Sequence, residues 1–136
     1  MVNLVIVSHS KKLADGVAEL AGQMVTGGCK IAVAAGIDDE ENPIGTDAVK
    51  IMSAIEEVFS ADGVVILVDL GSAILSAETA LDLLDPEIAE KVAISYAPLV
   101  EGALAAAVSA STGDDLQTVL AEAKAAGDLK LQQENK

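Results

Sequence analysis

The sequence feature that most restricts how this chain of 136 residues can fold is a set of four short apolar runs, each followed by a longer amphipathic stretch. Residues 2–8, 30–35, 63–69 and 91–96 are rich in small and β-branched aliphatic side chains, and each run has the length of one strand. Strands that alternate with helical stretches are typical of a mostly parallel sheet with helices on both faces. We therefore predict one doubly wound α/β domain.

The helices are predicted from the spacing of their apolar residues and from their capping signals. They are expected at residues 11–25, 46–59, 71–85 and 101–111, with a last helix from 113–115 to about 126. The residues expected to face the sheet are Leu13, Val17, Leu20, Ala21 and Met24 in the first helix, and Val49, Met52, Ile55 and Val58 in the second. Residues 1–126 are then the domain, and residues 127–136 form a frayed polar tail.

The charge balance argues against several classes of partner. The formal net charge is −14, and all eight basic residues are lysines. Nucleic acid is a poor candidate partner because phosphate neutralisation dominates that affinity, and a basic helix on a membrane surface is excluded. No apolar run approaches the ~20 residues that span a bilayer, and the start has no signal-peptide pattern, so we expect a cytoplasmic protein.

Cysteine, histidine and glycine patterns exclude further chemistry. The single cysteine, Cys29, rules out an internal disulfide and is expected to be a small buried hydrophobe. With one histidine in the chain, a zinc site would need unusual ligands, so we expect no metal and no cofactor. The acidic run at 38–41 lacks EF-hand spacing, and neither a phosphate-binding GxxxxGK[ST] loop nor a GxGxxG motif is present.

The candidate catalytic residues follow from the expected strand order 2-1-3-4. In this order the first and third strands are neighbours at the point where the order reverses, which is where open α/β sheets bind ligands. His9 then lies near Asp69. A neutral imidazole nitrogen can accept a phosphoryl group while a carboxylate accepts the other N–H. Two alternatives remain open here: His9 is a structural histidine, and Asp69 caps the next helix.

Candidate phosphate-binding residues lie at two helix starts. Gly71 and Ser72 begin a helix beside Asp69, and Ser10 begins the helix after His9. Free N–H groups and the positive end of a helix dipole can hold an anion there. Thr46, at the helix start after the second strand, is expected at the rim of the site or as a cap. Plain helix capping is the alternative explanation for each of these starts.

The segments VIVSHS, IDDEENPIGTDAVKI, VDLGSAILSAETALDLL and APLVEGALAAAVSA carry a resemblance to a known family. They resemble the phosphotransferase subunits of phosphoenolpyruvate-dependent dihydroxyacetone kinase, the DhaM family, which is similar to the mannose-type IIA domains of the sugar phosphotransferase system. The resemblance covers residues 1–126 and implies a doubly wound fold and a homodimer. It also implies an active histidine at His9, a supporting Asp69, and phosphate donors at Gly71 and Ser72.

Partners follow from the same resemblance. Members of the family accept a phosphoryl group from the phosphocarrier HPr and pass it to ADP on a separate kinase subunit. Some members carry additional HPr-like and enzyme I-like domains, so this chain looks like a stand-alone form or an excised domain. Because the chain has no arginine, it cannot form a bidentate guanidinium clamp on phosphohistidine. Backbone N–H groups are expected to hold the phosphoryl group, and the partner to supply further stabilisation.

Two other function classes are alternatives. A non-enzymatic, flavodoxin-like module that binds a small anion or a nucleotide would show a bound ligand and no phosphoryl transfer to His9. A receiver domain phosphorylated on Asp69 would need clustered acidic residues after the first strand, where this chain has Ser8, His9 and Ser10. That sequence argues strongly against a receiver domain.

Overall fold

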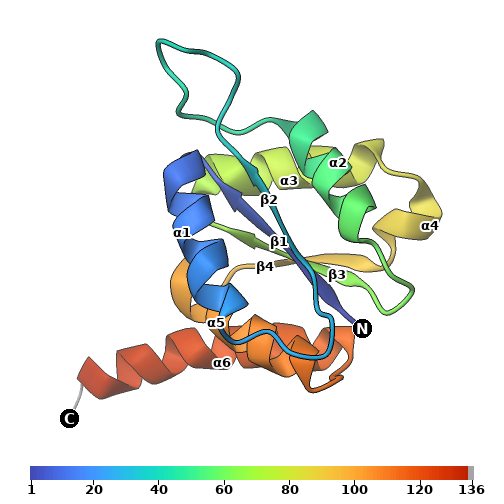
Figure 1. The fold of residues 1–136 in the computed structure, drawn as a ribbon, viewed down its shortest axis with the longest axis vertical. Helices are drawn as coiled ribbons and strands as arrows, with labels where there is room; N and C mark the ends of the chain where they lie inside the picture. Colours follow the sequence, from blue (N-terminus) through green and yellow to red (C-terminus); the bar gives the residue numbers. More distant parts are fainter. Residues whose placement is uncertain (135–136) are drawn as a thin grey trace.

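The sheet has the predicted order and direction. The computed structural model describes residues 1–134 and contains the strands β1 (Asn3–Ser8), β2 (Ile31–Ala35), β3 (Val64–Val68) and β4 (Val92–Ser95). All neighbouring strands are parallel, and their order is β2-β1-β3-β4 (Figure 1). The two central strands, β1 and β3, are buried along their whole length, as their continuous apolar sequences predict.

Helices cover both faces of the sheet, as predicted. The helices are α1 (Lys11–Gly22), α2 (Ala48–Val58), α3 (Gly71–Leu83), α4 (Pro86–Ala89), α5 (Leu99–Ser111) and α6 (Leu116–Glu134). One core cluster joins Leu4 and Ile6 to α1, α5 and α6, whereas the other joins Val5 and Val7 to α2 and α3 (Figure 1). Alternate residues of one strand therefore build two separate cores.

The predicted end and inner face of the first helix are partly wrong. α1 ends at Gly22 rather than at residue 25. Its buried residues are Ala14, Val17 and Ala21, whereas the predicted Leu13, Leu20 and Met24 are exposed. Small alanine side chains let the helix lie close to the sheet and to α5, and the larger side chains remain outside that contact.

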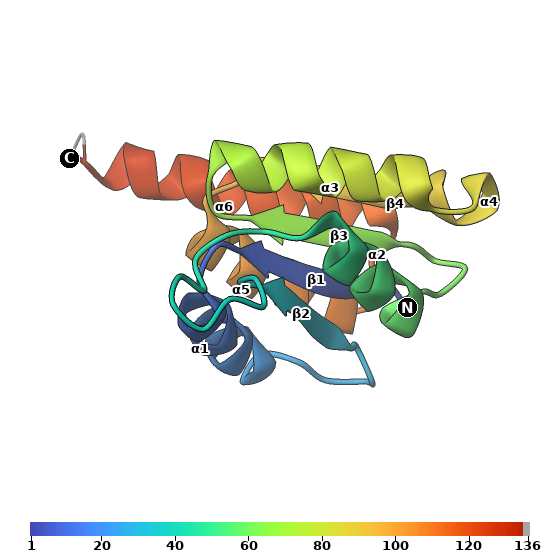
Figure 2. The same ribbon diagram turned by 90° about the horizontal axis from the view of Figure 1, so that it is seen from above.

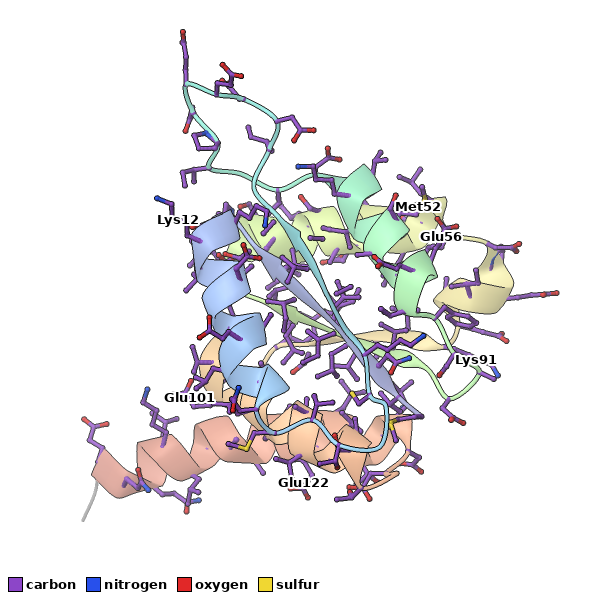
Figure 3. The ribbon with its side chains drawn as sticks, in the orientation of Figure 1. Lys12, Met52, Glu56, Lys91, Glu101 and Glu122 are labelled. Carbon is purple, nitrogen blue, oxygen red and sulfur yellow. The ribbon has the colours of Figure 1, made fainter. Side chains whose placement is uncertain are left out.

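The predicted cap and inner face of the second helix also need correction. Asp47, not Thr46, caps α2, because its carboxylate accepts the N–H groups of Val49 and Lys50. The Thr46 hydroxyl is instead hydrogen-bonded to that of Ser76 on α3, at 2.6 Å. The buried residues of α2 are Ile51, Ala54, Ile55 and Val58, whereas the predicted Val49 is exposed and Met52, labelled in Figure 3, is half-buried.

The last helix is longer than predicted. α6 continues to Glu134, so residues 127–134 are helical rather than frayed, and residues 135–136 of the predicted tail lie outside the described residues. Gly127 explains the continuation, because a Cβ there would lie only 2.6 Å from Pro98 Cδ, and the missing side chain permits this close packing. Lys130 adds an ion pair to Glu101 of α5. Figure 2 shows α6 extending past the carboxyl ends of the strands.

The structure also bears on the predictions made for Cys29 and for membrane-spanning segments. Cys29 is buried as expected, and burial raises the pKa of its thiol, which keeps the sulfur protonated near neutral pH. Within residues 1–134, the helices are all too short or too polar to cross a membrane.

Candidate functional site

The candidate site lies at the carboxyl ends of β1 and β3. Val7 of β1 pairs with Val68 of β3, so the chain leaves both strands at the same level of the sheet. His9 follows β1 immediately, and Asp69 follows β3. α1 and α3 begin two residues after His9 and Asp69, respectively, so two helix starts flank the pair. The predicted juxtaposition of His9 and Asp69 is therefore present in the structure.

The imidazole of His9 is held on one side by the carboxylate of Asp69. Nδ1 lies 2.9 Å from Asp69 Oδ1, and the backbone N–H of His9 donates to Oδ2 of the same carboxylate, also at 2.9 Å. The two side chains are 18% and 10% exposed, so the pair is largely withdrawn from solvent but still open to it. Because the ionised carboxylate can only accept, the neutral ring carries its hydrogen on Nδ1, where it is donated to Asp69. The lone pair of the ring is then on Nε2.

The second ring nitrogen faces the start of α3. Nε2 of His9 and the hydroxyl of Ser72 are hydrogen-bonded to each other. Gly71 and Ser72 lie in the first turn of α3, where N–H groups lack partners inside the helix, and these two have no other backbone acceptor among residues 1–134. The structure thus brings His9, Asp69 and Ser72 together at the start of α3, where the N–H groups of Gly71 and Ser72 are unpaired among the described residues.

The carboxylate of Asp69 is kept ionised. Its partial burial acts to raise the pKa, but hydrogen bonds from His9, Ser8 and Leu70 outweigh that effect and hold the pKa of Asp69 below its usual value. The capping residue of α3 is Leu70, and no side chain caps this helix. Asp69 accepts the N–H of Leu70 as well as those of His9, but it accepts none of the first-turn N–H groups of α3 and so does not cap this helix.

The two remaining predicted residues have local partners of their own. The hydroxyl of Ser10 accepts the N–H of Leu13 at 3.2 Å and caps α1. Thr46 bonds to Ser76, which lies one helical turn beyond Ser72 on α3. These contacts show how Ser10 and Thr46 are fixed. A contact of either residue with phosphate stays a prediction.

The connection between β2 and α2 holds the backbone around the histidine. Gly45 donates its N–H to the carbonyl of His9 at 2.9 Å, and Gly36 donates to the carbonyl of Ser8 at 3.2 Å. Gly36 has a φ of 71°, and a Cβ at this position would lie 3.1 Å from the carbonyl oxygen of Pro43. The tight turn at Gly36 therefore lets the connection fold back onto the end of β1.

One residue of the site was not singled out by its sequence. Ser8, the last residue of β1, is fully buried, and its hydroxyl donates to Asp69 Oδ2 at 2.8 Å. The available signal was a hydroxyl at the end of an otherwise apolar strand. Recognising its partner requires the register between β1 and β3, which the sequence pattern alone does not provide.

Within residues 1–134, no three His, Cys, Asp or Glu side chains gather as a set of metal ligands, either around His9 or elsewhere. A separate groove of about 740 Å³ lies between the end of β4, α5 and α6. Its lining includes Tyr96, Leu120 and Leu131 and none of the residues around His9.

Comparison with known proteins assigns the chain to a family. Residues 3–120 match the family model EIIA-man, described as the PTS system fructose IIA component. The chain belongs to this family. The EIIA-man match spans all four strands and begins at the first residue of β1, so the His9 site lies within it.

Individual relatives agree with the family assignment. The chain is 62% identical to the Escherichia coli protein named PEP-dependent dihydroxyacetone kinase, phosphoryl donor subunit DhaM, over 98% of this chain and 28% of that protein. It thus spans about a quarter of the length of such relatives. The Listeria innocua PEP-dependent dihydroxyacetone kinase 2, phosphoryl donor subunit DhaM, is 42% identical over 90% of this chain and 96% of its own length.

A solved structure supports the fold. The crystal structure of the unknown function protein EF1359 has a TM-score of 0.75 with this chain at 38% sequence identity, covering 90% of this chain and 92% of its own. The doubly wound α/β architecture predicted from the sequence, which is of the flavodoxin-like type, is therefore shared with an experimental structure.

Proposed function

We propose that this chain is a phosphohistidine carrier that takes a phosphoryl group from phospho-HPr on His9 and passes it to ADP on a dihydroxyacetone kinase subunit. The observation that carries the proposal is the His9 ring, fixed at Nδ1 by Asp69 and open at Nε2 toward the start of α3. The names of the relatives, phosphoryl donor subunits of a PEP-dependent dihydroxyacetone kinase, support it. Residues 1–126 form the proposed carrier domain.

The proposed transfer uses the open ring nitrogen. The Nε2 lone pair attacks the phosphorus of the donor's phosphohistidine, the new N–P bond forms, and the bond between phosphorus and the donor nitrogen breaks. The hydrogen on Nδ1 remains in its bond to Asp69, whose negative charge stabilises the positive charge that spreads over the ring. In the second step, a terminal phosphate oxygen of ADP attacks the same phosphorus, the N–P bond breaks, and ATP leaves with His9 restored.

The helix start is the proposed resting place of the phosphoryl group. The N–H groups of Gly71 and Ser72 lie at the start of α3, the positive end of its dipole, and the Ser72 hydroxyl is hydrogen-bonded to Nε2. Ser10 is proposed as a further donor, and Thr46 as a residue of the rim. Since the chain has no arginine, the cations that stabilise the transition state are expected to come from the partner. A weakly held group suits a carrier that must release it.

A reconstituted relay tests the proposal. The protein is incubated with phosphoenolpyruvate, enzyme I and HPr, and the product is examined for an acid-labile, base-stable phosphate on His9. Addition of the ADP-loaded kinase subunit should then remove that phosphate. A protein that binds a small anion or a nucleotide but never acquires phosphate under these conditions is a binding module instead.

Ionic strength should affect the first transfer. The chain carries a net charge of −14, so a donor with a basic docking face is attracted over a long range. The bimolecular rate of transfer from phospho-HPr is expected to fall as salt rises, because the Debye length shrinks from about 30 Å at 0.01 M to about 10 Å at 0.1 M. Rapid-quench kinetics over this range measure the effect. A transfer rate that does not change with salt concentration would argue against electrostatic steering of phospho-HPr.

We also expect a homodimer, with the groove beside β4 as its interface. Tyr96 and Leu131 line the groove and are 70% and 64% exposed, and β4 is an edge strand. Sedimentation should give a dimer at micromolar concentration, and Leu131→Asp should shift it toward monomer. Leu83→Asp is the matched control, because this leucine is 54% exposed at the far end of α3. A wild-type monomer contradicts the dimer, and a Leu131→Asp dimer contradicts this interface.

A further inference from the structure

The buried hydroxyl of Ser8 completes the environment of Asp69. Each oxygen of that carboxylate accepts two hydrogen bonds. Oδ1 accepts from Nδ1 of His9 at 2.9 Å and from the N–H of Leu70 at 2.7 Å. Oδ2 accepts from the N–H of His9 at 2.9 Å and from the hydroxyl of Ser8 at 2.8 Å. Ser8 therefore supplies the one side-chain hydroxyl among these four donors.

The Ser8 hydroxyl is itself held in a fixed direction. It accepts the N–H of Ser10 at 3.1 Å, so its own hydrogen is free to point at Asp69. Ser8 is fully buried, so bulk solvent does not reach this hydroxyl. The hydroxyl thus links the start of α1 to the carboxylate that follows β3.

A second serine in the sheet shows what Ser8 does beyond closing a turn. Ser95 also ends a parallel strand, is also buried, and accepts the N–H of Ala97, two residues later, at 3.2 Å. Ser8 makes the same turn contact with Ser10 and, in addition, donates to Asp69. The two residues therefore differ in the bond to the carboxylate, and Ser95 is a matched structural control.

We propose that Ser8 is a positioning residue for the phosphoryl transfer: its hydroxyl engages Oδ2 of Asp69 and so keeps Oδ1 on the Nδ1 hydrogen of His9. This inference rests on the proposed function of His9. Among the described residues, the Ser8 hydroxyl is hydrogen-bonded to Asp69 and Ser10 and not to the imidazole, so Ser8 acts through Asp69. Without its hydrogen bond, the carboxylate is both less fixed in direction and less stabilised as an anion.

The charge of Asp69 is also expected to depend on this bond. Burial acts to raise the pKa of Asp69, and the hydrogen bond from the Ser8 hydroxyl is one of those that lower it. Within residues 1–134, His9 is the one ion-pair partner of Asp69. Other titratable groups follow the site along the chain on the elements around it. They are Lys11 and Lys12 on α1, Asp38 after β2, Glu78 on α3 and Tyr96 after β4. Figure 3 shows Lys12 directed away from the strands.

Two measurements on the wild type, Ser8→Ala and Ser95→Ala test the inference. Carboxyl ¹³C NMR follows the titration of Asp69, and quench kinetics follow transfer from phospho-HPr as a function of pH. Ser8→Ala is expected to raise the midpoint pH of the Asp69 titration by roughly 0.5 to 1 pH unit. The acid limb of the plot of transfer rate against pH should move to higher pH by the same amount. It should also slow transfer at neutral pH by roughly tenfold, the value of one hydrogen bond to a charged group. Ser95→Ala should change none of these.

The possible outcomes separate the two proposals. If the wild type acquires no phosphate, the carrier function fails, whereas the Asp69 titration still tests the Ser8 contact. If the wild type transfers normally and Ser8→Ala leaves the Asp69 midpoint unchanged, or Ser95→Ala moves it equally, the role of Ser8 is overturned. Ser8→Cys fills the same space with a weak donor and should show the same upward shift, so the test does not depend on the stability of the alanine variant.

Discussion

Replacing His9 by alanine is expected to abolish phosphoryl transfer while the protein remains folded. His9 is the only histidine of the chain, so no other imidazole can take over the phosphoryl group. Its ring lies at the end of β1, outside both core clusters, so its removal opens no cavity in either core. Labelled phosphate from phosphoenolpyruvate, passed through enzyme I and HPr, measures the loss, and circular dichroism confirms the fold.

His9→Gln is the companion variant, because it keeps a polar side chain of similar length and lacks a nucleophilic imidazole. It should be as inactive as His9→Ala. An acid-labile phosphate on a well-folded His9→Ala protein would remove His9 from the relay and with it the proposed function.

Asp69→Asn is expected to slow transfer through His9 by about 10²-fold or more, within the range of an acid–base partner. The donors on Oδ2, from Ser8 and the His9 backbone, favour the amide oxygen at that position. The amide nitrogen then replaces Oδ1, where it donates to Nδ1 of His9 and leaves the N–H of Leu70 without its acceptor. The ring consequently carries its hydrogen on Nε2, where the attacking lone pair is needed. Quench kinetics with phospho-HPr measure the rate.

Asp47→Asn is the matched control for the lost charge. Asp47 caps α2 and has no contact with His9, and asparagine caps helices equally well. This variant should transfer at close to the wild-type rate, and both variants should bind HPr normally. Wild-type transfer by Asp69→Asn would mean that the carboxylate does not orient the ring, and the site would then depend on Ser72 and the helix-start N–H groups alone.

The strands and their order could be predicted because they depend on strong, local signals. The four apolar runs match β1 to β4 to within one residue at each end. Their alternation with helices leaves few parallel topologies. The order β2-β1-β3-β4 then brings the ends of β1 and β3 together, which is why His9 and Asp69 could be paired before the structure was known.

The inner faces of α1 and α2 could not be predicted reliably because alanine competes with larger residues for the contact. Ala14 and Ala21 are buried in α1, whereas Leu13 and Leu20 are exposed. Hydrophobicity ranks the leucines higher, but close packing favours the smaller side chain. The continuation of α6 depends in the same way on a tertiary contact, that of Gly127 with Pro98.

Within and around the site, the sequence did not predict the contacts that join residues far apart in the chain. Ser8 donates to a carboxylate 61 positions away, and Thr46 bonds to Ser76, 30 positions away. Thr46 was predicted as the cap in place of Asp47 because both residue types are found at helix N-caps and the two are neighbours in the sequence. These contacts depend on strand register and loop conformation, which the propensities of single residues do not predict.

The ring nitrogen that carries the phosphate tests the central claim most directly. The protein is labelled with ¹⁵N-histidine, phosphorylated through enzyme I and HPr, and studied by ¹⁵N and ³¹P NMR, where a single histidine contributes one set of ring signals. We expect phosphorus bonded to Nε2 of His9, with the hydrogen on Nδ1 retained in its bond to Asp69. Phosphorus on Nδ1, or no bond between phosphorus and the imidazole, would contradict the mechanism.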